Sequence, residues 1–557
     1  MPPPPFIFYL MKKRITLFPL LSFLLFFSCS DMNEVTELPK AMIFSADING
    51  VPMVPSKSVS DIPAGDVTFT FEFSSEIDID RFDFTAIVFT GGELEASYGE
   101  NHKILKLKPT EPLAHFTRYV LSVLPVEQLG VNLVESYSYT IVTSYDPSDK
   151  FERISDEELL TLVQEQTFKY FWDYAHPVSG LARERLGSGE TVTSGGSGFG
   201  VMTIPVGIER GFITRAEGAE RMDQIVTFLY EKAERFHGAF SHWLDGTTGK
   251  AKAFSTYDDG ADLVETAFMI QGLLAVQQYF NQNNPTENRI REYIQKLWEE
   301  VEWDFFTNGT DGLYWHWSAK HGWKMNMHIS GWNEGLIVYV LAASSPTHPI
   351  SKDIYDKGWA RNGGMLNGNK YYDITLPLGT RMGGPLFFTH YSFLGLDPRD
   401  LSDAYASYWE QNVAHARINH AYCAANPKKY AGYSDECWGL TASDIPNSYT
   451  ASSPTNDKGT IAPTAALASM PYTPEESMKA LRHFYYVLGD KLFGEYGFHD
   501  AFSLSNRWFA SSYIAIDQGP IVVMIENHRS GLLWDCFMKN TDVHRGLDKL
   551  GFTYVKK

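Results

Sequence analysis

The sequence predicts a multidomain protein in which a small immunoglobulin-like β-sandwich precedes an all-α (α/α)6 toroid. Three observations lead to this prediction. The chain of 557 residues is longer than one ordinary hydrophobic core accommodates. Residues 41–144 alternate between apolar and polar side chains as strands do. From Ser155 onward, apolar residues recur at helical spacing instead.

Residues 1–29 have the pattern of an export signal. Lys12 and Arg14 belong to a basic segment, and a short apolar run follows that ends at Ser28 and Cys29. The run is too short and wrongly flanked for a stable membrane span. A cysteine at this place predicts lipidation of Cys29 and an exported protein anchored to the cell envelope, in the periplasm or at the outer-membrane surface. The alternative is a signal that is cleaved elsewhere.

Residues 30–40 form a predicted linker, and residues 41–144 form the predicted β-sandwich. The segment "VTFTFEFS" alternates strictly, and "FDFTAIVFTG" and "SYSYTIVTS" are rich in β-branched and aromatic residues. Gly, Pro, Asn and Asp separate such segments at regular intervals, so about seven short strands are expected. Residues 145–154 are polar and form a second predicted linker.

Residues 155–557 form the predicted helical domain, which begins with a capping box made by Ser155 and Glu158. Roughly a dozen helices are expected. Long loops rich in Gly, Trp, His and Asn separate them, and such loops are usually functional. These features favour an (α/α)6 toroid whose inner helices present their N-terminal ends to a central cleft. The clearest predicted helices span residues 199–211, 215–235, 262–281, 287–304, 333–343, 402–416, 474–489 and 518–529.

Composition narrows the classes of partner. The net charge of −20 at pH 7 and the lack of a basic stripe argue against nucleic acid. Aromatic residues make up 14% of the chain, which suits stacking on sugar rings but also suits a large core. Zinc and Walker motifs are absent from the sequence. We expect a monomer without a cofactor or a metal, and one disulfide, Cys423 to Cys437, is compatible with the sequence.

The stretch "YDDGADLVETAF", residues 257–268, places several carboxylates at a predicted helix start. Asp258, Asp262 and Glu265 have the spacing i, i+4, i+7, which puts them on one helix face at a cost of a few tenths of a kcal/mol. N-capping explains any one such acid, but it explains a group of them less well. Three further acids lie near Trp, Asn or Gly where a loop meets a helix or in such a loop: Glu334, Asp444 and Asp517.

Glycoside hydrolysis uses this combination of groups. One carboxylic acid stays protonated to donate to the leaving oxygen, while an ionised one activates water or attacks. Neighbouring carboxylates help to raise the pKa of the acid. The acidic cluster is therefore interpreted as the wall of a sugar pocket. Calcium binding by this cluster is the weaker alternative, because the spacing is not that of an EF-hand. We interpret the glycine-rich residues 194–200 as a loop that brings backbone close to the cleft.

Colinear segments from residue 155 to residue 540 carry a resemblance. They include "DDGADLVETAFMIQGLL", "NEGLIVYVLAASSPTHPI", "GGPLFFTHYSFLGLDPR" and "IDQGPIVVMIENHRSGLLW". Together they resemble the bacterial glucoamylase-like family, glycoside hydrolase family 144. The resemblance implies an (α/α)6 barrel that hydrolyses β-1,2-glucan, either internally or by releasing sophorose from a chain end. It also implies an exported lipoprotein with a β-sandwich ahead of the barrel.

The resemblance further implies residue roles. The expected general acid is Glu334, and the family is expected to invert configuration, so that a base activates water. Asp517 is the first choice for this base because it lies at the N-terminus of another predicted inner helix, and Asp444 is the second choice. Trp332 and Gly335 stand where tyrosine and alanine are common in the family. These two differences affect the expected shape of the sugar subsites and leave the carboxylates in place. The other acids that match the family motif are assigned to substrate binding: Asp258, Asp262 and Glu265.

Neighbouring aromatic and basic side chains complete the predicted sugar site. Aromatic rings would stack on glucose and basic groups would hydrogen-bond hydroxyls. For each of them a purely structural role is the alternative. The residues concerned are Arg183, Arg185, Phe199, His242, Trp315, His316, Trp317, Trp332, His390 and Trp438.

Two other functions stay open at this point. One is a glycosidase of the same fold that acts on another β-glucan. The other is a non-catalytic surface lipoprotein that binds glycans, which would keep the aromatic residues but would not need Glu334. A lyase acting on uronates is disfavoured, because the acidic clusters would repel a polyuronate.

Overall fold

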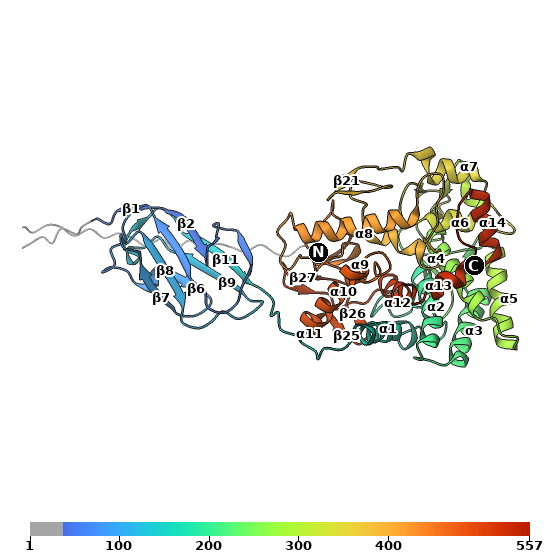
Figure 1. Cartoon of the computed structure of the whole chain (residues 1–557), viewed down its shortest axis with the longest axis horizontal. Helices are drawn as coiled ribbons and strands as arrows, with labels where there is room; N and C mark the ends of the chain where they lie inside the picture. Colours follow the sequence, from blue (N-terminus) through green and yellow to red (C-terminus); the bar gives the residue numbers. More distant parts are fainter. Residues whose placement is uncertain (1–36, 557) are drawn as a thin grey trace, which may run out of the picture.

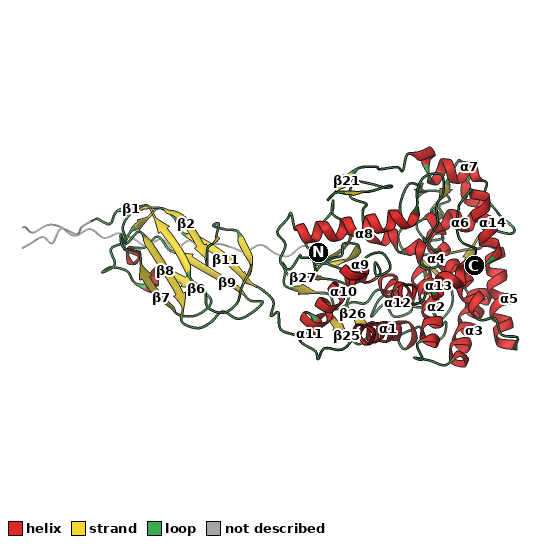
Figure 2. Ribbon diagram, in the orientation of Figure 1, coloured by secondary structure: helices red, strands yellow, loops and turns green. Residues whose placement is uncertain are grey.

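The computed structural model describes residues 37–556, and Figure 1 shows that they form two lobes joined by one connecting segment. The lobe nearer the N-terminus contains strands, and the larger lobe is mainly helical, as the colours of Figure 2 show. The predicted leader and the predicted lipidation site at Cys29 lie outside the described residues. Within residues 37–556, no helix combines the length and the apolar character needed to cross a membrane.

The first lobe is a β-sandwich of two sheets. One sheet has the order β3 (Val51–Pro52), β2 (Ile43–Ile48), β5 (Phe69–Phe73), β8 (Ile104–Pro109) and β7 (Leu94–Tyr98). The other has the order β4 (Ser58–Ile62), β11 (Tyr137–Thr143), β9 (Arg118–Val123) and β6 (Ile87–Phe89). A short parallel pair joins β1 (Lys40–Ala41) to β10 (Asn132–Leu133).

The alternation seen in "VTFTFEFS" fixes which side of β5 faces the core. Phe69, Phe71 and Phe73 are buried, whereas Thr70 and Glu72 between them are more exposed. Successive side chains of a strand point to opposite faces, so one face of β5 supplies the core. The three phenylalanines belong to one apolar cluster with residues of the second sheet, among them Leu121, Val123 and Ile141.

The second lobe begins with α1 (Asp156–Trp172), and Ser155 and Glu158 form the expected capping box. All eight helices whose ranges the sequence predicts are present, although several ends are shifted. Short helices such as α7 (Lys352–Ile354) and α11 (Gly489–Leu492) lie between the longer ones. The other helices are α2 (Ser194–Glu209), α3 (Arg215–Glu231), α4 (Leu263–Tyr279), α5 (Pro285–Glu299), α6 (Leu336–Ser344), α8 (Tyr408–Ala425), α9 (Pro463–Leu467), α10 (Pro474–Arg482), α12 (Ala515–Arg529), α13 (Leu532–Met538) and α14 (Thr541–Leu550).

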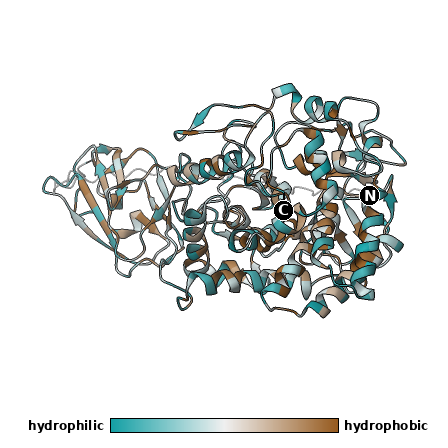
Figure 3. Ribbon diagram, turned by 45° about the vertical axis from the view of Figure 1, so that its right-hand side comes forward, coloured by the Kyte–Doolittle hydropathy of each residue, from teal (hydrophilic) through white to brown (hydrophobic). Residues whose placement is uncertain are grey.

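The helices fall into a buried and a peripheral set. In α2, α4, α6 and α12 nearly every residue is buried. Peripheral helices such as α1, α3, α5 and α14 bury one face only, and Figure 3 shows hydrophilic and hydrophobic stretches alternating along the outer ribbons. Helix α2 packs against both α4 and α12, and α4 also packs against α6. Helices that are apolar all round form the centre of the lobe.

The long predicted loops contain short hairpins and strand pairs. Strand β17 pairs with β19 and sets Asp262 opposite His316, while β12 pairs with β15 and sets Thr193 opposite Trp243. These pairings bring residues from distant loops together. The short strands are β12 (Thr191–Thr193), β13 (Arg235–Phe236), β14 (Ala239–Phe240), β15 (Trp243–Asp245), β16 (Ala251–Lys252), β17 (Ala261–Asp262), β18 (Leu313–Tyr314), β19 (His316–Trp317), β20 (His328–Ile329), β21 (Lys370–Tyr371), β22 (Ile374–Thr375), β23 (Ala442–Ile445), β24 (Ser448–Ala451), β25 (Phe493–Gly494), β26 (Gly497–Phe498), β27 (Phe502–Ser503) and β28 (Trp508–Phe509).

The structure corrects the prediction that the glycine-rich residues 194–200 form a loop. These residues form the first two turns of α2. The glycines serve close helix packing. A Cβ at Gly198 would lie 2.3 Å from the carbonyl oxygen of Phe268 in α4. A Cβ at Gly196 would lie 2.7 Å from Ala515 in α12. Small residues let helix backbones approach this closely, so the usual low helix propensity of glycine is outweighed by packing.

The lobes contact each other through few residues. The Tyr145 hydroxyl donates a hydrogen bond to Asp490 at 2.7 Å, and Asp61 accepts one from the Gly432 amide at 2.8 Å. The structure also corrects the expectation of a disulfide, because Cys423 and Cys437 are both free thiols buried in the helical lobe.

Candidate active site

The acidic stretch at residues 257–268 forms the start of α4, but the helix begins only at Leu263. Asp262 is its N-cap, and its Oδ1 accepts the amides of Val264 and Glu265, both at 3.0 Å. The expectation that Asp258 shares a helix face with the other acids is therefore wrong, because Asp258 precedes the helix. The acids still meet, since Asp258 and Asp262 both contact one histidine, His316.

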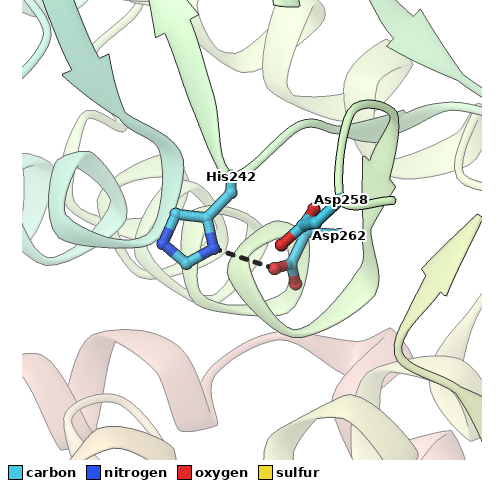
Figure 4. A group of neighbouring side chains, drawn as sticks. All are labelled: His242, Asp258 and Asp262. Carbon is cyan, nitrogen blue, oxygen red and sulfur yellow. Dashed lines mark hydrogen bonds and ion pairs between the residues drawn. The ribbon is translucent and has the colours of Figure 1, made fainter. Parts of the chain in front are cut away.

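Two histidines are held by these aspartates. His242 Nδ1 lies 3.0 Å from Asp262 Oδ2, and Figure 4 shows Asp258 and Asp262 converging in front of the His242 ring. His316 Nε2 lies 3.3 Å from Asp258 Oδ2. Burial alone would lower the pKa of His242, but the nearby carboxylates of Glu265, Asp262 and Asp258 raise it to about 9. His242 is therefore a cation at neutral pH.

This cluster also has the spacing of a metal site, since donor atoms of His242, Asp258 and Asp262 lie within 4.8 Å of one another. His242 Nδ1 is already hydrogen-bonded to Asp262. In this structure the three side chains are arranged as hydrogen-bonded and ion-paired partners, and Asp258 and Asp262 also contact His316.

Glu265 lies one turn into α4 and points at the start of α2. Its Oε2 accepts the backbone amide of Gly195 at 2.7 Å. Helix N-termini stabilise negative charge, because their first amides have no partner inside the helix. Burial nevertheless raises the pKa of Glu265 to about 6, and the charges of Asp262 and Asp258 act in the same direction. Glu265 lines a cavity beside these acids.

Glu334 lies just before α6 and its side chain is almost fully buried. Its carbonyl oxygen accepts a hydrogen bond from the Ser392 hydroxyl. Burial raises the pKa of its carboxyl to about 7, and the negative charges of Glu265 and Asp262 add to the shift. Because these charges act on Glu334, the three acids from two separate helix starts form one electrostatic group.

A cavity of about 440 Å³ opens beside this group. The N-terminal ends of α2, α4 and α12 contribute to its wall, as the sequence predicts for the inner helices. Its wall combines aromatic rings with a few charged groups, which is the usual composition of a ligand site. The lining residues are Glu184, Arg185, Thr193, His242, Trp243, Phe254, Glu265, Phe387, Tyr391, Ala442, Tyr449, Ile514 and Ile516.

A second acidic group lies behind Tyr391. The Tyr391 hydroxyl donates to Asp517 Oδ1 at 3.5 Å, and Asp517 is buried in the first turn of α12. Asp444 is bound by the Arg185 guanidinium at 3.3 Å and by the Ser512 hydroxyl at 2.6 Å. Burial raises the pKa of the Tyr391 hydroxyl, and the charges of Asp517, Glu334 and Glu265 act in the same direction. Acids of both groups therefore act on Tyr391.

Comparison with known proteins shows what this chain is similar to. A family model described as "Putative glucoamylase" matches residues 326–541. A crystal structure from Bacteroides uniformis with the same description is 61% identical, covers 72% of this chain and 99% of its own, and has a TM-score of 0.72. The chain belongs to the glucoamylase-like family, glycoside hydrolase family 144.

Two other members of the glucoamylase-like family have names that state an activity. An endo-β-1,2-glucanase from Chitinophaga pinensis, solved with sophorotriose and glucose, is 52% identical, covers 72% of this chain and 99% of its own, and has a TM-score of 0.71. An exo β-1,2-glucooligosaccharide sophorohydrolase from Parabacteroides distasonis is 49% identical over 420 residues. That match covers 71% of this chain, which spans 58% of the length of the sophorohydrolase.

Several residues predicted to contact sugar have structural roles in this family member. Trp438 is fully buried and donates its indole N–H to the Glu476 carbonyl oxygen. His390 is buried against Ser469, and burial lowers its pKa to about 3. Phe199 and Trp332 are buried in the same core. None of these four side chains presents surface to a sugar, which corrects the prediction of direct contact.

Three other residues predicted to contact sugar, Arg183, Trp315 and Trp317, are not among the residues that line the cavity. Arg183 stacks on Tyr174 at 4.8 Å, whereas Arg185 two residues later lines the cavity. Trp315 stacks beside His316, and Trp317 packs against other aromatic rings of the core.

Sequence reasoning did not single out several wall residues of this site. Glu184 and Trp243 are sequence neighbours of the predicted residues Arg183, Arg185 and His242, and Phe254 lies in a long loop between two predicted helices. The sequence therefore indicated their neighbourhood but not the residues themselves. Tyr391 and Tyr449 carry no signal in the sequence, because they reach the cavity from a 3-10 turn and a short strand. Asp500, which contacts Asp444, also gave no signal.

Proposed function

We propose that this protein hydrolyses β-1,2-glucosidic bonds and that Glu334 is the general acid. The observation that carries the proposal is the buried Glu334 carboxyl, whose pKa of about 7 keeps a proton available near neutral pH. Glycosidases need such an acid beside an ionised carboxylate. The bond type comes from the names of the two relatives, a β-1,2-glucanase and a β-1,2-glucooligosaccharide sophorohydrolase.

The base in this proposal is Asp517, which acts through the Tyr391 hydroxyl that separates it from the cavity. Asp444 is the second choice, and it is hydrogen-bonded by the Arg185 guanidinium and the Ser512 hydroxyl. In either case the carboxylate takes a proton from water while Glu334 protonates the leaving oxygen from the other side. Water then attacks the face opposite the leaving group, and the anomeric configuration inverts.

Substrate binding is assigned to the cavity wall. Trp243 and Phe254 offer ring faces to glucose, and Arg185 and His242 offer charged donors to its hydroxyls. Asp258 and Asp262 hold His316 and His242 in place from behind. Glu265 faces the cavity directly and accepts hydrogen bonds from sugar hydroxyls in this proposal. No step requires a cofactor or a metal.

Other features are proposed on the same basis. The buried and peripheral helices support an (α/α)6 toroid, and the two packed sheets support an immunoglobulin-like sandwich. The predicted signal supports an exported lipoprotein anchored at Cys29, with the sandwich as a spacer between the anchor and the active site. We propose a monomer.

The test is a time course with purified protein and linear β-1,2-glucan, with the products resolved by chromatography. Early release of sophorose alone indicates action at a chain end, as in the sophorohydrolase, whereas mixed lengths indicate internal cleavage. Linear β-1,3- and β-1,4-glucans are the controls, and turnover of one of these alone would replace the proposed substrate. Glucan binding without any product would support the non-catalytic glycan-binding function instead.

A further inference from the structure

Asp500 and Asp517 form a pair of carboxyl groups that is nearly closed to solvent. Asp500 lies between β26 and β27, and Asp517 lies in the first turn of α12. Their exposed fractions are 2% and 1%. Asp500 Oδ2 accepts the amide of Asp444 at 2.6 Å, and Asp517 Oδ1 accepts the Tyr391 hydroxyl at 3.5 Å. One oxygen of each carboxyl is thus bound by the surrounding protein.

Within residues 37–556, the other oxygen of each carboxyl group has no donor of this kind. Among the described residues, no N–H or O–H group donates to Asp500 Oδ1 or to Asp517 Oδ2. The two carboxyl groups lie close enough to form a hydrogen bond with one another. Such a bond requires a proton on one of the partners, because two carboxylates can only accept.

The charged surroundings do not stabilise two negative charges here. The groups that act on the pair are Asp444, Arg185 and Tyr391, with Tyr449 on the cavity side. The cation among them, Arg185, is already bound by Glu184 and Asp444. Burial raises the pKa of Asp500 to about 7 and raises that of Asp517 well above its usual value, and the charge of Asp444 acts in the same direction on both. Paired buried carboxyls of this kind titrate as one unit.

We propose that Asp500 is a positioning residue for the reaction and that the base is a proton-sharing pair of Asp500 and Asp517 that carries one proton and one negative charge. The inference deepens the function proposed above and rests on it. A pair of carboxyl groups that holds one proton still carries one negative charge, so it can accept a second proton. Two adjacent acids have separate pKa values because they resist ionising together. Neither Asp500 nor Asp517 alone would hold one proton and one negative charge in a site so closed to solvent.

The proton balance of the step is as follows. One O–H bond of the water breaks as its oxygen bonds to the anomeric carbon, and the glycosidic bond breaks as Glu334 gives its proton to the leaving oxygen. The water proton goes to the Tyr391 oxygen while the Tyr391 proton moves to Asp517. The pair then holds two protons and no charge, and Glu334 is ionised. Exchange of one proton with solvent restores both groups.

The test is the pH profile of kcat/KM for Asp500→Asn. An asparagine keeps the shape of the aspartate side chain. It can accept a hydrogen bond from the Asp444 amide and donate one to Asp517 Oδ2, but it cannot share a titratable proton with Asp517. Asp517 then becomes a single carboxylate with an amide donor, so the acidic limb of the profile should move at least one pH unit to lower pH. A merely structural role would change the rate or the stability without moving this limb. An unmoved limb in a folded Asp500→Asn protein would overturn the proposal.

Asp457→Asn is the matched control. Asp457 is buried as well and accepts hydrogen bonds from the hydroxyls of Tyr422 and Tyr433, away from the cavity wall. Its pH profile should match that of the natural protein.

A spectroscopic readout separates this inference from the proposed function. The infrared difference spectrum between the natural protein and Asp500→Asn at pH 8 should show the band of a protonated buried carboxyl. That band is expected whether or not β-1,2-glucan is the substrate. Its absence would contradict the shared proton even if hydrolysis is observed, whereas a present band without any glucan turnover would leave only the proposed function contradicted.

Discussion

The Glu265 carboxylate accepts the Gly195 amide at 2.7 Å, so an acid at the start of α4 is held by the first turn of α2. The contact is close because residue 195 has no side chain, and a Cβ there would lie 2.5 Å from Glu265 Oε2. The glycine-rich start of α2 thus has a direct effect on the acidic cavity. It lets two buried helices meet and places one carboxylate against an unpaired helix amide.

Gly195→Ala should therefore reduce kcat/KM by at least about tenfold, because the added methyl forces Glu265 away from its amide and away from the sugar. Measuring kcat/KM for Gly195→Ala in the Glu265→Gln background separates the effect on Glu265 from a general disturbance of the fold. If the contact with Glu265 carries the effect, the two substitutions together should cost clearly less than the sum of their separate effects. Additive losses would show that Gly195 matters for another reason.

His242→Gln should destabilise the protein in a pH-dependent way. The pKa of His242 is raised from 6.5 to about 9 by its carboxylate neighbours, so the charged ring contributes stability that is fully present below pH 6.5 and is lost as pH rises through 9. The free energy of unfolding, measured with urea, should differ most between variant and natural protein at pH 6. The difference should shrink by pH 10. A constant difference would contradict the assigned charge.

Glu334→Gln should gain stability relative to the natural protein as the pH rises. Because the pKa of Glu334 is raised from 4.5 to about 7, ionisation is resisted in the folded state, and stability falls between these two pH values. The loss is on the order of 3 kcal/mol. A glutamine has no such loss, so the variant should gain stability relative to the natural protein between pH 4 and pH 8 in urea unfolding. Parallel pH curves for the two proteins would show that Glu334 titrates normally.

Phe254→Ala should weaken substrate binding without destabilising the fold. Phe254 is 50% exposed and lines the cavity, with its ring 4.2 Å from that of His242 and 4.9 Å from that of Trp243. Loss of one stacking ring should raise KM about two- to tenfold. Phe44→Ala on the β-sandwich is the control, since that ring is also exposed. Equal KM values for both variants would remove Phe254 from the binding site.

The acidic part of the site was predictable from sequence because its residues lie at helix starts. An acid followed directly by an apolar run marks the N-terminus of a buried helix. The N-termini of the buried helices in one lobe point at a common cavity. Asp262, Glu265 and Glu334 follow this pattern, and the structure places them in one electrostatic group. Asp517 follows it too and lies at the start of a buried helix.

The aromatic part was predictable only in part, because a tryptophan or phenylalanine suits a core as well as a sugar site. Trp438 and Phe199 are in the core, while Phe254 and Tyr391 reach the cavity. Which of these occurs depends on the packing of distant segments. The same holds for residues 194–200, where glycine usually indicates a loop but here permits α2 to contact α4 and α12. Local propensity gave way to tertiary packing there.

The most direct measurement compares Glu334→Gln with the natural protein on two substrates, linear β-1,2-glucan and an aryl β-sophoroside with an acidic phenol as leaving group. The phenol departs without protonation, so it does not need the general acid. We predict that the variant loses about 10²–10⁴-fold in kcat/KM on the glucan but keeps most of its activity on the aryl substrate. Near-normal hydrolysis of the glucan by the variant, or an equal loss on both substrates, would contradict the assignment of Glu334 as the acid.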